Sequence, residues 1–117
     1  MAPKLPFRTR RLSRPFIERR RWARRKPGPG VSCQVLLEGA LSAAVLVNLS
    51  EGGSCVESPR PLAVDGRLTL RLFNRDCLGS LTAAARVVWC RADFGAFRAG
   101  LHFERPLTAA DLHPFLS

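Results

Sequence analysis

A short polar segment follows a run of apolar residues in the first half of the chain, where Asn48, Ser50 and Gly53 form the pattern N-x-S-x-x-G. Asn48 and Ser50 are two residues apart, so in an extended strand their side chains point to the same face. Gly52 and Gly53 together predict a tight turn whose bare backbone is open to close approach. An amide, a hydroxyl and glycine backbone on one surface can hold a base edge or a phosphate. We therefore expect a ligand-binding surface at this turn.

The N-terminal segment carries the excess positive charge of the chain, whose formal net charge is +10. Residues 1–26 contain eleven of the nineteen lysines and arginines but one of the nine acidic residues, so residues 27–117 contain eight of each. Such an arm predicts an anionic partner, namely a nucleotide, a nucleic acid or a membrane surface. It is also typical of a solvated leader, and three prolines without a sustained period predict that residues 1–17 are disordered.

Guanidinium groups make bidentate contacts with phosphate oxygens and with the O6/N7 edge of guanine. An arginine arm ahead of the N-x-S-x-x-G turn therefore suits a ligand that combines phosphates with guanine. Trp22 lies among these arginines and is expected either as an exposed arm residue or as a stacking partner.

Apolar residues at alternating positions predict six short strands in the body of the chain. The expected strands lie at residues 31–37, 41–49, 54–57, 67–72, 81–89 and 97–103. Antiparallel strands this short and numerous favour a closed barrel, which removes exposed edges. The predicted fold class is mainly all-β: a six-stranded antiparallel β-barrel over residues 31–105, with a short C-terminal helix and a disordered basic N-terminal arm.

The same alternation predicts the side chains that fill the barrel. In the second strand the expected inward residues are Leu41, Ala43, Val45, Val47 and Leu49. In the fifth strand they are Leu81, Ala83, Ala85, Val87 and Trp89.

A C-terminal helix is predicted over residues 108–116. Thr108 is expected as its N-cap with Asp111 three residues later, a capping box. Leu112 and Phe115 place apolar side chains on one stripe, whereas Pro114 predicts a short or kinked helix. We expect this helix to close one end of the barrel.

Catalysis and metal binding have no support in the sequence. The two histidines, His102 and His113, have no nucleophile or carboxylate pair near them, and we expect both to be structural. The four cysteines form no C-x-x-C pair and have no histidine at metal-ligand spacing, so no metal and no cofactor are expected. Free thiols, no signal peptide and no long apolar run predict a reduced, cytoplasmic protein without a membrane span.

The joint pattern of an R-x-x-x-R pair, strands, N-x-S-x-x-G, further strands and a closing helix resembles the PilZ domain, the bacterial receptor for cyclic di-GMP. The resemblance covers residues 18–117, with the R-x-x-x-R segment at residues 18–26. It implies that Arg20 and Arg24 clamp the phosphates and guanines of the ligand, and that Asn48, Ser50 and Gly53 hold a guanine. Further candidates for ligand contact are Arg21, Trp22, Arg25 and Gly52. The pair Arg21/Arg25 stays open as the alternative register.

The leading hypothesis is therefore a cyclic di-GMP receptor that transmits the level of this second messenger to a protein effector in the bacterial cytoplasm. One alternative is a small barrel that binds nucleic acid through its arginine arm, although the body shows no exposed aromatic platform for stacking bases. The other is a ligand-free adaptor of motility or secretion machinery, which the intact N-x-S-x-x-G pattern disfavours.

Overall fold

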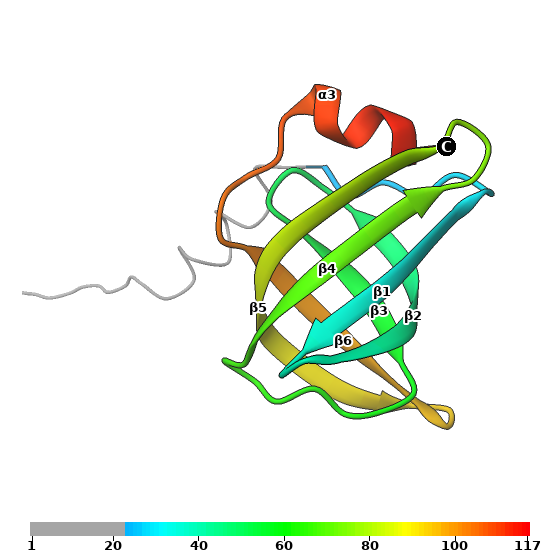
Figure 1. Cartoon of the computed structure of the whole chain (residues 1–117). Helices are drawn as coiled ribbons and strands as arrows, with labels where there is room; N and C mark the ends of the chain where they lie inside the picture. Colours follow the sequence, from blue (N-terminus) through cyan, green and yellow to red (C-terminus); the bar gives the residue numbers. More distant parts are fainter. Residues whose placement is uncertain (1–22) are drawn as a thin grey trace, which may run out of the picture.

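The computed structural model describes residues 23–117, which form a closed antiparallel barrel of six strands with a short helical segment at the C-terminus (Figure 1). The strands are β1 (Val31–Leu37), β2 (Ala40–Leu49), β3 (Gly53–Ser58), β4 (Arg67–Asn74), β5 (Gly79–Asp93) and β6 (Ala96–Phe103). Their order around the barrel is β1-β2-β3-β6-β5-β4, and β1 closes the ring by pairing with both β2 and β4. The predicted fold class is confirmed. The disorder predicted for residues 1–17, together with Arg20, Arg21 and Trp22, lies outside the described residues.

Two tight hairpins connect neighbouring strands at one end of the barrel. Glu38 and Gly39 between β1 and β2 have φ values of +51° and +80°, and Phe94 and Gly95 between β5 and β6 have +49° and +84°. Two consecutive residues with positive φ are typical of the two-residue turns whose twist matches that of the flanking strands. Both connections are therefore β-hairpins between antiparallel neighbours.

The barrel interior holds one apolar core whose residues alternate along the strands. In β1 the buried side chains are Cys33 and Val35, and in β4 they are Leu68, Leu70 and Leu72, as predicted. Burial raises the pKa of the Cys33 thiol to about 12, so this group is neutral and packs as a small apolar side chain.

The inward face predicted for β2 is wrong except at Leu49. Leu46 is buried, whereas Val45 is 60% exposed. A β-bulge between Leu46 and Asn48 adds one residue, Val47, to the pairing with β3. The bulge lets Leu46 and Leu49 both face the core although they are three residues apart. Both faces of this strand are apolar in sequence, so alternation alone could not identify the inner one.

The predicted inward position of Trp89 is also wrong, for the same reason. A second bulge lies in β5 between Val87 and Trp89, where Val88 is the extra residue in the pairing with β6. Val87 is buried in the core, and Cys90 packs against the core from the other side of the bulge. Trp89 is thereby turned to the outer surface of the barrel, where it is half-buried.

The C-terminal segment closes one end of the barrel, as predicted (Figure 1). It consists of α3 (Ala109–Leu112) and the 3-10 turn η2 (His113–Phe115), shorter than the predicted helix because Pro114 cannot continue it. The capping box is present: Asp111 N–H donates to Thr108 Oγ1 at 3.0 Å, and Thr108 N–H donates to Asp111 Oδ2 at 3.1 Å. Leu112 and Phe115 are both buried in the core.

Residues 23–117 contain no group of three or more metal-ligating side chains. The same residues contain no helix with the length and hydropathy of a membrane span.

The corrected register of β2 predicts opposite stabilities for two neighbouring substitutions. Leu46→Ala should lower the free energy of unfolding by about 2–5 kcal/mol, because it leaves a cavity in the core. Val45→Ala should change it by less than about 0.5 kcal/mol, because this side chain faces solvent. Urea denaturation of both variants measures the difference, and a larger loss for Val45→Ala would contradict the register described above.

Candidate ligand-binding site

The N-x-S-x-x-G segment forms the turn between β2 and β3, which Ser50 closes. Ser50 N–H donates to the Gly53 carbonyl at 2.8 Å, and the Ser50 hydroxyl lies 3.1 Å from that carbonyl oxygen and 3.2 Å from Gly53 N. Ser50 is buried, with 8% of its surface exposed. The expectation that this hydroxyl is displayed on the outer surface is therefore wrong: its main partner in this structure is the turn itself.

Asn48 begins a row of paired residues that crosses four strands on the outside of the barrel. Asn48 pairs with Cys55 on β3, Cys55 pairs with Gly100 on β6, and Gly100 pairs with Trp89 on β5. We call these four residues the Asn48 row. The row lies between the two bulges, so the bulges determine which side chains the row presents outward.

The hydrogen bond of Asn48 orients its side-chain amide. Asn48 Oδ1 accepts from Cys55 N–H at 3.1 Å. Because a backbone N–H needs an acceptor, the oxygen must be the atom on this side, and the Nδ2 group is left as a donor of two hydrogen bonds. Asn48 thus ties β2 to β3 beside the bulge and keeps donors for an external acceptor.

Two glycines allow the close packing that this surface requires. A Cβ at Gly53 would overlap the Leu101 carbonyl oxygen of β6, and a Cβ at Gly100 would overlap the indole of Trp89. Trp89 therefore lies flat across the Gly100 position. Gly52, the further glycine predicted as a contact, is buried, and its carbonyl accepts from Phe103 N–H at 2.9 Å.

Residues 23–30 pack along the same end of the barrel. Arg25 and Leu49 exchange two backbone hydrogen bonds of 2.9 Å, and Gly28 N–H donates to the Phe115 carbonyl at 3.0 Å. Paired residues in an antiparallel bridge share a side, so Arg25 lies on the side of Leu49, and Arg24 lies on the side of Asn48. The backbone pairing therefore separates the two arginines that the sequence left as alternatives.

Positive charge gathers over the Asn48 row. Burial raises the pKa of the Cys55 thiol, the charges of Arg98, Arg24 and Arg91 lower it in part, and the charge of Glu57 raises it. Arg98 is bound by two carboxylates, at 3.2 Å to Glu57 Oε2 and 3.0 Å to Asp93 Oδ2. Among residues 23–117, no ion pair engages Arg24 or Arg91. Their charges are thus available to an anion.

Sequence reasoning missed Trp89 and Arg91 as members of this surface. The guanidinium carbon of Arg91 lies 5.3 Å from the centroid of the Trp89 ring, within the range of a cation–π contact. Alternation assigned Trp89 to the core because nothing in the residues marks the bulge at Val88. The one available signal was the pair of Trp89 with Gly100, since a glycine opposite an aromatic residue on a neighbouring strand can accommodate a flat ring.

Comparison with known proteins agrees with this architecture. The sequence matches the family model of the PilZ domain over residues 18–115, so the chain belongs to the PilZ domain family. No curated protein gives a significant match.

Two solved structures from Escherichia coli share the fold. One is YcgR in complex with c-di-GMP, with a TM-score of 0.61 and 22% identity, covering 73% of this chain and 38% of that chain. This chain thus spans well under half of that protein. The other is the PilZ domain of YcgR with c-di-GMP, with a TM-score of 0.62 and 19% identity, covering 81% of this chain and 84% of that chain.

The Ser50 geometry predicts a cost in stability for removing the hydroxyl. Ser50→Ala should lower the free energy of unfolding by about 1–3 kcal/mol, because Gly53 N–H loses its acceptor in a partly buried turn. Ser42→Ala is the matched control, since the Ser42 hydroxyl makes one exposed contact of 3.4 Å to the next carbonyl. Thermal denaturation compares them, and equal melting temperatures would refute the closing role of Ser50.

Proposed function

We propose that this chain is a cyclic di-GMP receptor that acts in the bacterial cytoplasm and passes its ligand occupancy to a protein partner. The observation that carries the proposal is the outer face around the Asn48 row, where a donor amide and an indole packed on a glycine lie near Arg24 and Arg91, which have no ion pair within residues 23–117. The two YcgR structures, both with c-di-GMP, support the choice of ligand.

Each part of the ligand has a chemical counterpart on this face. Guanine presents O6 and N7 as acceptors, which match the free donors of Asn48 Nδ2. The phosphates match guanidinium groups. We assign this role to Arg24 and to Arg20, which lies four residues earlier in the sequence. The Trp89 ring lies over Gly100 and carries the Arg91 guanidinium at 5.3 Å from its centroid, so a guanine can stack on this cation–π pair rather than on a bare ring face. Ser50 and Gly53 contribute by holding the turn that positions Asn48 beside the backbone of β3.

The choice of Arg20/Arg24 over Arg21/Arg25 is supported by the pairing of Arg25 with Leu49. Leu49 is fully buried and faces the interior, so the Arg25 side of the bridge turns away from the Asn48 row. The charge of Arg24 reaches the Cys55 thiol within that row. Arg21, Trp22 and Gly52 remain candidates for additional contacts.

The role is that of a receptor rather than an enzyme. The surface offers donors and cations for a nucleotide, and we assign no nucleophile or general base to it. Binding at the outer face would change what the barrel presents to other proteins, because the ligand adds two guanines and covers Arg24. We therefore propose that the partner distinguishes the loaded from the empty face.

Substitution of the two arginines tests the binding face. Arg20→Ala and Arg24→Ala should each weaken cyclic di-GMP binding by about ten- to a hundred-fold, because each removes a hydrogen bond to a charged phosphate. Arg25→Ala is the matched control and should bind nearly as the unmodified chain does. Isothermal titration calorimetry measures all three. Large losses for Arg21→Ala and Arg25→Ala instead would assign the other register.

Removal of residues 1–17 separates a receptor from a nucleic-acid binder. These residues hold five basic side chains but none of the proposed contacts, so the shortened chain should keep its affinity for cyclic di-GMP. A nucleic-acid binder would instead lose affinity and salt dependence, because each lost phosphate contact lowers both. Titrations with cyclic di-GMP and with a DNA duplex at two salt concentrations compare the two. If the chain binds DNA tightly, loses that affinity on truncation and does not bind the dinucleotide, the nucleic-acid-binding hypothesis replaces the receptor hypothesis.

A further inference from the structure

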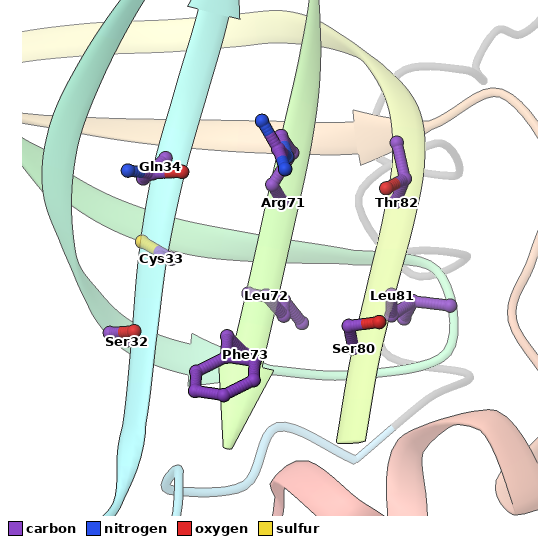
Figure 2. A pocket seen from close by; sticks show the side chains of 9 residues that line it. All are labelled: Ser32, Cys33, Gln34, Arg71, Leu72, Phe73, Ser80, Leu81 and Thr82. Atoms are coloured by element: carbon purple, nitrogen blue, oxygen red, sulfur yellow. The ribbon is translucent and has the colours of Figure 1, made fainter. Parts of the chain in front are cut away.

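A recess lies on the side of the barrel opposite the Asn48 row. It is a shallow hollow of about 310 Å3 over β1, β4 and the first half of β5 (Figure 2). In the ring of strands, β1 and β4 are the farthest from β3 and β6, which carry the centre of the Asn48 row. The outward side chains that line the hollow are Ser32, Gln34, Arg71, Phe73, Ser80 and Thr82.

These six side chains form two parallel rows with β4 in the middle. Arg71 is flanked by Gln34 on β1 and Thr82 on β5. Phe73 is flanked by serines on both sides, and Figure 2 shows its ring beside these short side chains. The serines leave space around the ring, and 42% of Phe73 is exposed. The hollow therefore combines one cation, neutral hydrogen-bonding groups and an open aromatic surface.

Arg71 differs from the other arginines on this side of the barrel. Arg67 lies 3.7 Å from Glu104 Oε2, and Arg86 lies 3.2 Å from Asp65 Oδ1. Arg71 has no ion pair within residues 23–117, and no carboxylate lines the hollow. The positive charge at the centre of the hollow is thus uncompensated.

We propose that this hollow is a docking site for an acidic peptide segment of a protein partner, with one carboxylate on Arg71 and a neighbouring apolar side chain on Phe73. The inference rests on the part of the proposed function that gives the receptor a protein partner, and it assigns a surface to that partner. A guanidinium pairs with a carboxylate through two parallel hydrogen bonds. The volume of about 310 Å3 lies at the lower limit for ligand pockets and suits one or two side chains.

The geometry favours side-chain recognition of a peptide over other partners. The barrel is closed, so no strand edge is open for a peptide to extend the sheet. A nucleic acid presents a phosphate at every nucleotide and is bound by several cations along its backbone. Arg71 is the one arginine that lines this hollow and has no ion pair within residues 23–117, which matches a single carboxylate.

Nuclear magnetic resonance titration of the full 15N-labelled chain tests the site residue by residue. The probe is the peptide acetyl-Gly-Phe-Glu-Leu-Gly-amide, and its Glu→Gln form is the neutral control. The glutamate peptide should shift the Arg71 side-chain Nε–H and the backbone amides of Gln34 and Thr82. Site-resolved signals are needed because the basic arm attracts any acidic peptide. The Arg71→Gln variant should bind the glutamate peptide more weakly than the unmodified chain by about ten-fold or more. The unmodified chain should bind the neutral peptide more weakly than the glutamate peptide by a similar factor.

Arg60→Gln is the matched control variant, since Arg60 is exposed in the loop between β3 and β4 and should leave the shifts unchanged. Equal affinity for the two peptides, equal loss in Arg60→Gln, or no shift at these amides with millimolar peptide would overturn the site. Oligothymidylate that shifts the same amides in an Arg71-dependent way would assign the hollow to nucleic acid instead.

The Asn48→Ala variant should lose binding of cyclic di-GMP but keep binding of the peptide, and the Arg71→Gln variant should do the reverse. Peptide binding without any dinucleotide binding would therefore reject the receptor and retain this site.

Discussion

Closure of the barrel is the constraint on which the rest of the structure depends. Six strands enclose a small interior, so each strand turns every second side chain inward and the outer surface follows from the same alternation. The chain interrupts this alternation twice, at the bulges of β2 and β5. The Asn48 row lies between them. Bulges re-aim side chains, and here they turn an amide and an indole outward onto one surface while Leu46 and Val87 stay in the core.

The end of the barrel that carries the N-x-S-x-x-G turn is also where both ends of the described chain meet. Residues 23–30 pair with the last residue of β2 and with the C-terminal segment that seals the core. The Leu107 N–H donates to the Glu51 carbonyl at 2.7 Å, so the turn is held from the C-terminal side as well. This backbone network gives the basic segment a defined entry onto the barrel. Arg24, the second residue of the described chain, thereby acquires a fixed side relative to Asn48.

Charge is distributed differently on the two faces that we interpret as binding surfaces. Exposed ion pairs contribute little to stability, so pairing mainly decides which arginines still attract an anion. Over the Asn48 row, Glu57 and Asp93 compensate Arg98, while Arg24 and Arg91 stay unpaired among the described residues. On the opposite face Arg71 alone is uncompensated within residues 23–117. A dianionic nucleotide and a single carboxylate are the ligands that these two arrangements favour.

The sequence by itself determined the number of strands, the closed barrel, the capped C-terminal segment and the turn at N-x-S-x-x-G. These features follow from local signals: alternation, glycine turns and capping residues act between neighbours in the chain. Tertiary structure alone decided which face of β2 is buried and where Trp89 points. It also decided that the Ser50 hydroxyl bonds within its own turn, and that Arg24 rather than Arg25 lies on the side of Asn48. The buried face of β2 and the direction of Trp89 depend on bulges, where one extra residue reverses every side chain beyond it and leaves no mark in the order of the residues. The side of Arg24 depends on the bridge between Arg25 and Leu49, which are far apart in the sequence. The Ser50 bond is local, but it forms only because the turn brings the Gly53 backbone back to the hydroxyl.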